Sequence, residues 1–214
     1  MAFQGPIGEL LQDPRIWRAG RASAAMARGV STGWPELDAA LGGGWPLGQL
    51  TELLVDDHGT GELTLLLPAL GRLTAGNDDA GGAPKWIMLV APPYMPYAPA
   101  LAGAGLDPAR FLVVHAKQAG DTLWVMEQAL RSRTCIAVAG WTNLARQAPL
   151  RRLQLAAGPS GAWVLLFRDA RARLAPSPAP LRIHFMRERA AGRARLHILK
   201  RRGGPPAVAA ADLG

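Results

Sequence analysis

From Val30 onward, the apolar residues follow two alternating spacings. Short, continuous apolar runs indicate buried strands, and longer stretches with apolar residues three or four positions apart indicate helices. The predicted strands are 49–55, 85–91, 111–115, 135–140 and 162–168. The predicted helices are 34–41, 62–74, 97–104, 122–132 and 147–158. Strands that alternate with helices predict an α/β fold with a mostly parallel sheet flanked by helices.

The two ends of the chain follow other patterns. Residues 182–189 and 193–201 alternate apolar and polar side chains and are joined by Ala190-Ala191-Gly192, which predicts a closing antiparallel hairpin. The tail from Gly203 is rich in proline and small residues, so we expect residues 203–214 to be disordered. Residues 1–29 contain few strand-like positions and are predicted to form an N-terminal arm before a single domain at 30–202.

Length and cysteine content narrow the class of protein. A chain of 214 residues buries enough surface to fold without a disulfide or metal staple. The single cysteine, Cys135, excludes a disulfide framework and a cysteine-based zinc site, and it predicts a reducing, cytoplasmic environment. No apolar run approaches the ~20 residues of a membrane helix, so no membrane partner is expected.

Positive charge is concentrated in the second part of the chain. Residues 1–130 carry 8 basic and 13 acidic side chains, whereas residues 131–214 carry 16 basic and 3 acidic ones. Such a basic segment indicates contact with DNA, contact with an acidic protein surface, or a solvated sheet edge, and the charge alone does not choose among them. The candidate binding residues are Arg146, Arg151 and Arg152 by one helix and Arg193, Arg195, Lys200, Arg201 and Arg202 on the hairpin.

The loop between the first long strand and the next helix stands where a phosphate-binding P-loop would lie. A P-loop has the pattern G-x-x-x-x-G-K-[ST], in which backbone N–H groups and the lysine bind phosphate. When Gly61 is taken as the second glycine of this pattern, Asp56 stands at the position of the first glycine. Glu62 stands at the position of the lysine, and Leu63 stands at the position of the serine or threonine. A further glycine, Gly59, lies between Asp56 and Gly61. Because the lysine position is now acidic, we predict that this loop does not bind ATP and that the protein uses no cofactor.

Two stretches around this loop resemble a known family. The segment STGWPELDAALGGGWPLGQLTE at 31–52 resembles the region before the P-loop in the RecA superfamily. With GTGELTLLLPAL at 59–70, the chain more narrowly resembles the ImuA family, the RecA-like, SOS-induced accessory proteins of bacterial translesion DNA synthesis. The resemblance spans roughly residues 30–202 and implies a RecA-like domain with a degenerate P-loop.

The resemblance also shows which catalytic positions have changed. Where RecA places its catalytic glutamate after a strand, this chain has Pro92-Pro93. Where the Walker B aspartate would stand, it has Gly140-Trp141. The segments expected to match the two DNA-binding loops of RecA, 142–148 and 158–161, are short, so RecA-style filament binding to single-stranded DNA is not expected. The resemblance therefore implies a protein that is not an enzyme.

The partners that the resemblance implies are those of a scaffold. ImuB, the Y-family-like protein encoded beside ImuA, is the first, and RecA, an error-prone replicative-type polymerase, DNA and a second copy of the chain are the others. An alternative of a different class is a SulA-like cell-division inhibitor that binds FtsZ, which would not require the basic half. A third alternative, an active P-loop ATPase, requires all three changed positions to be compensated.

Aromatic and histidine residues supply the remaining candidates. Trp86, Trp124 and Trp163 lie in predicted strands or helices and are expected in the core. The tryptophans in predicted arms or loops are expected either to contact a partner or to fold back on the core: Trp17, Trp34, Trp45 and Trp141. The stiff, partly aromatic segment 92–97 is a candidate partner site at a strand end. His184 and His197 fall on facing strands and could pair, but the scattered histidines predict no metal site.

Overall fold

The computed structural model describes residues 29–79, 83–116, 119–188 and 192–213. Within these residues the main sheet has eight strands in the order β10-β9-β8-β3-β7-β6-β4-β5. Its strands are β3 (Leu50–Val55), β4 (Trp86–Val90), β5 (Phe111–Val114), β6 (Cys135–Trp141), β7 (Trp163–Asp169), β8 (Leu181–Glu188), β9 (Arg193–Lys200) and β10 (Ala207–Asp212). The strands β3 to β8 run parallel, which confirms the predicted α/β fold with a mostly parallel sheet.

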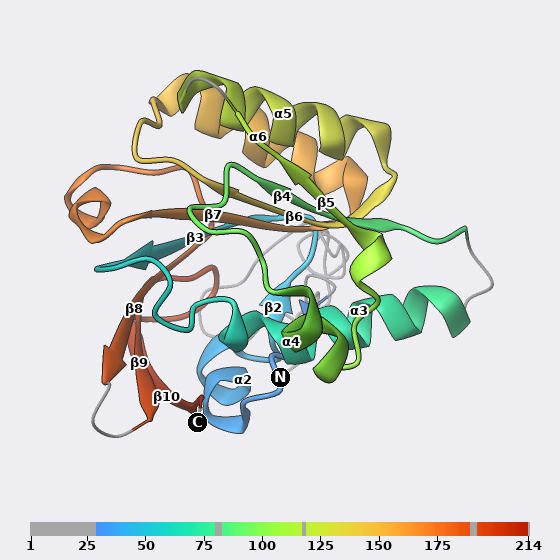
Figure 1. The fold of residues 1–214 in the computed structure, drawn as a ribbon. Helices are drawn as coiled ribbons and strands as arrows, with labels where there is room; N and C mark the ends of the chain where they lie inside the picture. The colour runs from blue at the N-terminus through green and yellow to red at the C-terminus, as the bar shows by residue number, and fades with distance from the viewer. Residues whose placement is uncertain (1–28, 80–82, 117–118, 189–191, 214) are drawn as a thin grey trace, which may run out of the picture.

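Helices cover both faces of this sheet (Figure 1). On one face lie α5 (Ala119–Ser132) and α6 (Gln147–Ser160), and on the other lie α2 (Pro35–Leu41), α3 (Leu67–Asp79) and α4 (Ala98–Gly103). Short 3-10 turns are η1 (Thr64–Leu66), η2 (Pro108–Arg110) and η3 (Ala170–Leu174), and a two-stranded sheet joins β1 (Gly29–Val30) to β2 (Trp45–Pro46). No helix in the described part of the chain is both long and apolar enough to cross a membrane.

The end of the chain corrects one prediction. The closing hairpin is confirmed, because β8 and β9 pair antiparallel with Phe185 opposite Leu196. The predicted disorder of the tail is wrong for residues 207–212, because they form β10, a further antiparallel strand with Ala209 opposite Leu196. Ala209 and Ala211 are buried, since small side chains fit between the sheet and α2. Proline-rich composition alone does not reveal that β9 leaves an open edge for this segment to pair with.

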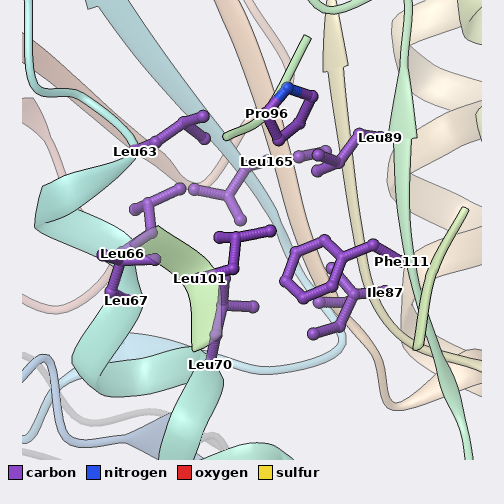
Figure 2. A pocket seen from close by; sticks show the side chains of 12 residues that line it. Leu63, Leu66, Leu67, Leu70, Ile87, Leu89, Pro96, Leu101, Phe111 and Leu165 are labelled. Carbon is purple, nitrogen blue, oxygen red and sulfur yellow. The ribbon is translucent and has the colours of Figure 1, made fainter. Parts of the chain in front are cut away.

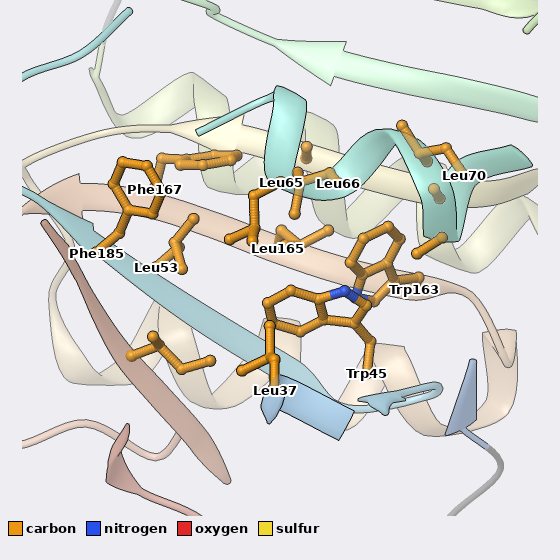
Figure 3. Close-up of a cluster of buried hydrophobic side chains, with 14 of the residues drawn as sticks. Leu37, Trp45, Leu53, Leu65, Leu66, Leu70, Trp163, Leu165, Phe167 and Phe185 are labelled. Atoms are coloured by element: carbon orange, nitrogen blue, oxygen red, sulfur yellow. The ribbon is translucent and has the colours of Figure 1, made fainter. Parts of the chain in front are cut away.

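The core gathers tryptophans from segments far apart in the sequence (Figure 3). Trp45 packs against Trp163 with ring centroids 5.4 Å apart, and Trp141 stacks on Phe167 at 4.5 Å. The core position of Trp163 is confirmed, and both Trp45 and Trp141 fold back on the core although the sequence placed them in loops. Trp17 lies outside the described residues.

Two tryptophan predictions are wrong. Trp86 is 39% exposed because it is the first residue of β4, at the end of the sheet. Trp124 is 59% exposed, whereas its neighbours Leu123 and Met126 supply the buried side of α5. The fourth loop tryptophan, Trp34, is partly buried, and its indole N–H donates to the carbonyl of Leu65 at 3.0 Å.

Asp38 holds the segment that leads into the first long strand. Its carboxylate accepts hydrogen bonds from the Ser31 hydroxyl and the Thr32 backbone N–H, both at 2.7 Å. Burial raises the pKa of Asp38, but these hydrogen bonds and the nearby Arg72 outweigh burial, so the pKa lies below its ordinary value of 3.8. Ser31 and Thr32 therefore donate to Asp38 of α2 and do not cap the first N–H groups of the helix. Pro35, the first residue of α2, has no backbone N–H to be capped.

The glycine turn after α2 allows a close backbone approach. Gly42 and Gly44 have φ angles of 80° and 108°, in the left-handed region that favours glycine. A Cβ on Gly44 would lie 2.2 Å from the carbonyl oxygen of Val30, so any larger residue would separate β2 from β1. The turn and Asp38 together fix the entry of the chain into β3.

We expect Asp38→Ala to lower the free energy of unfolding by about 1–2 kcal/mol at neutral pH, because two hydrogen bonds to a charged group are lost. A carboxyl group whose pKa is lowered on folding stabilises the protein above its unfolded pKa, and this contribution is lost as the pH falls through the folded value. The difference between wild type and variant should therefore shrink below pH 3.8 in urea unfolding curves. A difference that stays constant from pH 6 to pH 3 contradicts this role.

Candidate functional site

The loop that the sequence predicts to be a degenerate P-loop follows β3 at the carboxyl edge of the sheet and leads into η1. Asp56 and Asp57 are exposed at its start, and Gly59 and Gly61 have φ angles of 76° and 106°. Positive φ angles turn successive backbone N–H groups toward the inside of the loop, as they do in phosphate-binding loops. The loop thus keeps a geometry that could bind an anion.

The anion inside this loop is the side chain of Glu62. One carboxylate oxygen accepts from the Gly59 N–H at 2.8 Å, and the other accepts from the Thr60 N–H at 2.9 Å. Glu62 is buried, and the Thr60 hydroxyl closes the loop further by donating to the carbonyl of Asp57 at 3.0 Å. The N–H groups that would face a phosphate are therefore already bound to a carboxylate of the same loop.

Aromatic and histidine side chains surround the loop. The ring of Tyr94, from the segment after β4, lies against Gly59, where an added Cβ would approach a ring carbon to 2.7 Å. At the start of the loop, Asp56 Oδ1 lies 3.1 Å from His184 Nε2. The expected pairing of His184 with His197 is present, with ring centroids 6.3 Å apart. Among the described residues, no group of three His, Cys, Asp or Glu side chains could hold a metal ion.

A small apolar cavity lies between the loop segment and the sheet (Figure 2). Leucines of η1 and α3 face Ile87, Leu89 and Leu165 of the sheet across it, and Pro96 lies at its rim. The lining carries no polar group that could orient a substrate. Cys135 is no nucleophile either, because burial raises the pKa of its thiol and keeps it protonated.

A buried ion network lies beneath the carboxyl edge. Glu52 on β3 is fully buried and accepts from Arg168 Nη1 of β7 at 3.0 Å and from Arg182 Nε of β8 at 2.7 Å. The Ser177 hydroxyl donates to the same carboxylate at 2.8 Å. Arg182 alternates with apolar residues in the sequence, but it points into the protein, so it is not a surface contact of the hairpin.

The predicted basic residues do not form one patch. Arg193 and Lys200 lie at opposite ends of β9, roughly 23 Å apart for seven residues of strand. Arg202 lies near Gly48 and Gln154 at the amino edge of the sheet. Two helix residues, Arg146 and Arg151, are exposed and, like Arg193 and Arg202, have no partner among the described residues.

The other four predicted basic residues have partners within the protein. Arg152 Nε lies 3.2 Å from Glu127, and Arg195 pairs with Glu188 at 2.8 Å. Lys200 Nζ donates to the carbonyl of Ser177 at 3.0 Å. Arg201 donates to the carbonyls of Ala40 and Pro205, so it joins the end of α2 to the turn before β10.

No sequence pattern predicted that residues 170–180 form the loop after β7. Residues 158–161, expected to follow a strand, instead complete α6 and its left-handed cap at Gly161. The segment that follows β7 at the carboxyl edge is 170–180, which contains η3 and the exposed Arg171 and Arg173. The position of Pro159 inside α6 concealed this boundary, because proline usually ends a helix.

No family model matches the chain. It is 32% identical over 145 residues to Protein ImuA of two Caulobacter vibrioides strains, which covers 65% of this chain and 57% of each relative. It is also 30% identical over 118 residues to the cell division inhibitor SulA of Edwardsiella piscicida, covering 55% of this chain and 67% of that relative. The chain belongs to the ImuA- and SulA-like proteins.

The relatives carry two different names, Protein ImuA and cell division inhibitor SulA. The chain spans less than two thirds of the length of the ImuA proteins that it matches. Two features of this ImuA- and SulA-like protein are tested below: the loop filled by Glu62 and the charge network centred on Glu52.

We expect Glu52→Gln to lower the free energy of unfolding of this ImuA- and SulA-like protein by about 3–5 kcal/mol, because two buried arginines would lose their counter-charge. Urea unfolding followed by circular dichroism measures the change. The matched control is Glu188→Gln, which breaks the exposed pair with Arg195 and should cost less than ~1 kcal/mol. Equal effects of the two substitutions contradict a dominant role of the buried network.

We expect Glu62→Ala to lower the free energy of unfolding by about 1–3 kcal/mol, because the Gly59 and Thr60 N–H groups lose their acceptor. Neither the wild type nor this variant should gain thermal stability from millimolar ATP with Mg²⁺ in a thermal-shift assay.

The control for that loop is Asp57→Ala, which removes an exposed side chain and leaves the carbonyl that Thr60 uses. Asp57→Ala should change the free energy of unfolding by less than ~0.5 kcal/mol. An ATP-dependent rise in the melting temperature of the wild type would overturn the interpretation of the loop as closed.

Proposed function

We propose that the chain is a non-catalytic accessory protein of SOS-induced translesion DNA synthesis in the cytoplasm. It would bind ImuB, with RecA, the error-prone replicative-type polymerase and DNA as further partners. The observation that carries the proposal is the occupation of the degenerate P-loop by Glu62, in a chain that belongs to the ImuA- and SulA-like proteins. A RecA-like ancestry of the sheet and loop is part of the proposal.

The contacts of the loop support the absence of nucleotide chemistry. A phosphate at the Gly59 and Thr60 N–H groups would have to displace Glu62 from two short hydrogen bonds. It would also approach Asp56 and Asp57, and like charges at ~4 Å cost on the order of 4 kcal/mol near a protein surface. The loop itself contains no lysine, and the guanidinium of Arg187, which lies near Gly61, donates to the carbonyl of Gly192 at 3.1 Å.

The surface supports a role in assembly. The segment after β4 exposes Tyr94, Met95 and Tyr97 beside the closed loop, on a backbone stiffened by neighbouring prolines. Exposed aromatic and methionine side chains on a rigid backbone are common anchors of protein interfaces. This edge of a parallel sheet is where α/β enzymes bind ligands, and here it presents apolar side chains instead.

A second candidate is inhibition of cell division by binding FtsZ. The match that covers 67% of the SulA of Edwardsiella piscicida favours it. The exposed arginines of the second part of the chain are not explained by this candidate, whereas an accessory protein that works beside DNA and several proteins has a use for them. We therefore rank it second.

The test is a clean deletion in the source bacterium, complemented by plasmid copies. We expect the deletion to reduce ultraviolet-induced mutation to rifampicin resistance to the uninduced level, and the wild-type copy to restore it. Asp57→Ala should complement fully, because it leaves the loop intact. Overexpression should not produce filamentous cells.

Two results would overturn the proposal. Normal induced mutagenesis in the deletion strain excludes a role in translesion synthesis. Filamentation on overexpression, suppressed by extra FtsZ, assigns the protein to division control instead.

A further inference from the structure

Two loops lie side by side at the carboxyl edge of the sheet, where β6 and β7 end (Figure 1). The Thr142 N–H donates to the carbonyl of Phe167 at 3.1 Å, and the Asp169 N–H donates to the Asn143 side chain at 2.8 Å. Gln147 at the start of α6 donates to the carbonyl of Pro176. These contacts join residues 142–147 and 169–176 into one surface.

Each of the two loops exposes a leucine. Leu144 is 73% exposed on the first loop, and Leu174 is 84% exposed on the second. A single exposed leucine is ordinary on a protein surface. Two exposed leucines on adjoining loops leave apolar surface in contact with water at the carboxyl edge of the sheet. Exposed apolar surface of this kind is typical of a contact surface.

The same two loops carry exposed arginines. Arg146 lies on the first loop and Arg173 on the second, both with no acidic partner among the described residues. Arg171 is close to Asp169, but the distance from Nε to Oδ1 is 4.0 Å, and that same oxygen accepts the Arg171 backbone N–H at 2.7 Å. The surface therefore keeps an excess of positive charge that is free to meet carboxylates.

The buried Glu52 network holds the second loop in this position. Arg182, paired with Glu52, donates to the carbonyls of Ala172 at 2.7 Å and Ala175 at 3.1 Å. Ser177 donates to Glu52 and also accepts the Ala179 N–H at 3.1 Å. A buried ion network rarely stabilises a fold more than apolar residues would. Its hydrogen bonds end on the backbone of this loop, so it pre-organises the loop for binding and reduces the ordering cost of an interface.

We propose that Leu144, Arg146, Arg171, Arg173 and Leu174, the Arg-Leu surface, bind an acidic protein segment that carries two aliphatic side chains. The aliphatic side chains pack on the leucines, and the carboxylates pair with the arginines. Single-stranded DNA is bound through stacking of bases on aromatic rings, and this surface offers leucines in their place. The inference rests on the proposed accessory role and names the surface through which that role is performed.

The test begins with selection of a random 12-residue phage-displayed peptide library on the wild-type protein. We expect the enriched peptides to be rich in Asp and Glu and to contain at least two of Leu, Ile or Val. A fluorescein-labelled peptide of the most enriched sequence should bind at least tenfold more weakly to Leu144→Ser/Leu174→Ser and to Arg171→Glu/Arg173→Glu. All four side chains are exposed, so both variants should fold as the wild type does.

The matched control combines Leu155→Ser on α6 with Arg133→Glu, an exposed arginine that precedes β6 at the opposite end of that strand. Leu155 is 75% exposed and lies eight residues beyond Gln147, about 12 Å along the helix. This variant should bind the peptide as the wild type does. Failure to enrich any peptide, enrichment of basic peptides, or equal affinity of the wild type and the Leu144/Leu174 variant would each overturn the Arg-Leu surface.

A fluorescein-labelled 20-residue thymidine oligonucleotide separates the DNA alternative. The proposal is overturned, and the surface is assigned to nucleic acid, if three results occur together. The oligonucleotide competes with the peptide, binds more weakly to Arg171→Glu/Arg173→Glu, and binds Leu144→Ser/Leu174→Ser as it binds the wild type.

Induced mutagenesis distinguishes failure of the Arg-Leu surface from failure of the proposed accessory function. If the deletion loses mutagenesis but Leu144→Ser/Leu174→Ser restores it, the surface fails and the accessory function stands, whereas normal mutagenesis in the deletion overturns the function itself.

Discussion

The burial of Glu52 between Arg168 and Arg182 is the constraint on which the functional edge of this protein depends. The three residues lie on β7, β3 and β8, adjacent strands at the middle of the sheet, and are almost completely removed from water. Desolvating these charges is costly, so the arrangement is stable only while each strand keeps its register and each hydrogen bond is made. Because Arg182 also binds two carbonyls of the loop after β7, the network transmits the rigidity of the sheet to the surface.

At the same edge, the loop after β3 directs two of its N–H groups at a carboxylate of its own chain. The glycines of the degenerate P-loop still turn N–H groups inward, but Glu62 supplies the anion from within the chain. Because this carboxylate is part of the chain, it fills the loop without the entropy loss of binding a free anion. What remains is a rigid edge with exposed tyrosine, methionine, leucine and arginine side chains, which is suited to holding proteins.

The number of arginines in the second part of the chain does not show what each arginine does. The excess of arginine in the second part of the chain is a property of the sequence, but its residues serve different ends in the structure. Arg182 neutralises a buried glutamate, and Arg201 binds the carbonyl-rich end of α2. Arg171 and Arg173, which no sequence pattern singled out, are exposed on the loop that Arg182 holds. The charge of a sequence therefore indicates a partner only when the structure shows which arginines are exposed and which are buried in ion pairs.

By itself, the sequence determined the α/β class, most helices and strands to within a few residues, the hairpin and the failure of the P-loop pattern, because periodicity and short motifs are local properties. Only the tertiary structure decided that residues 207–212 form a strand, that Trp86 and Trp124 are exposed, and that Glu62 fills the loop it follows. It alone also brought the loops after β6 and β7 together. These features depend on neighbours distant in the chain, since burial, edge pairing and ion pairing are set by which segments meet.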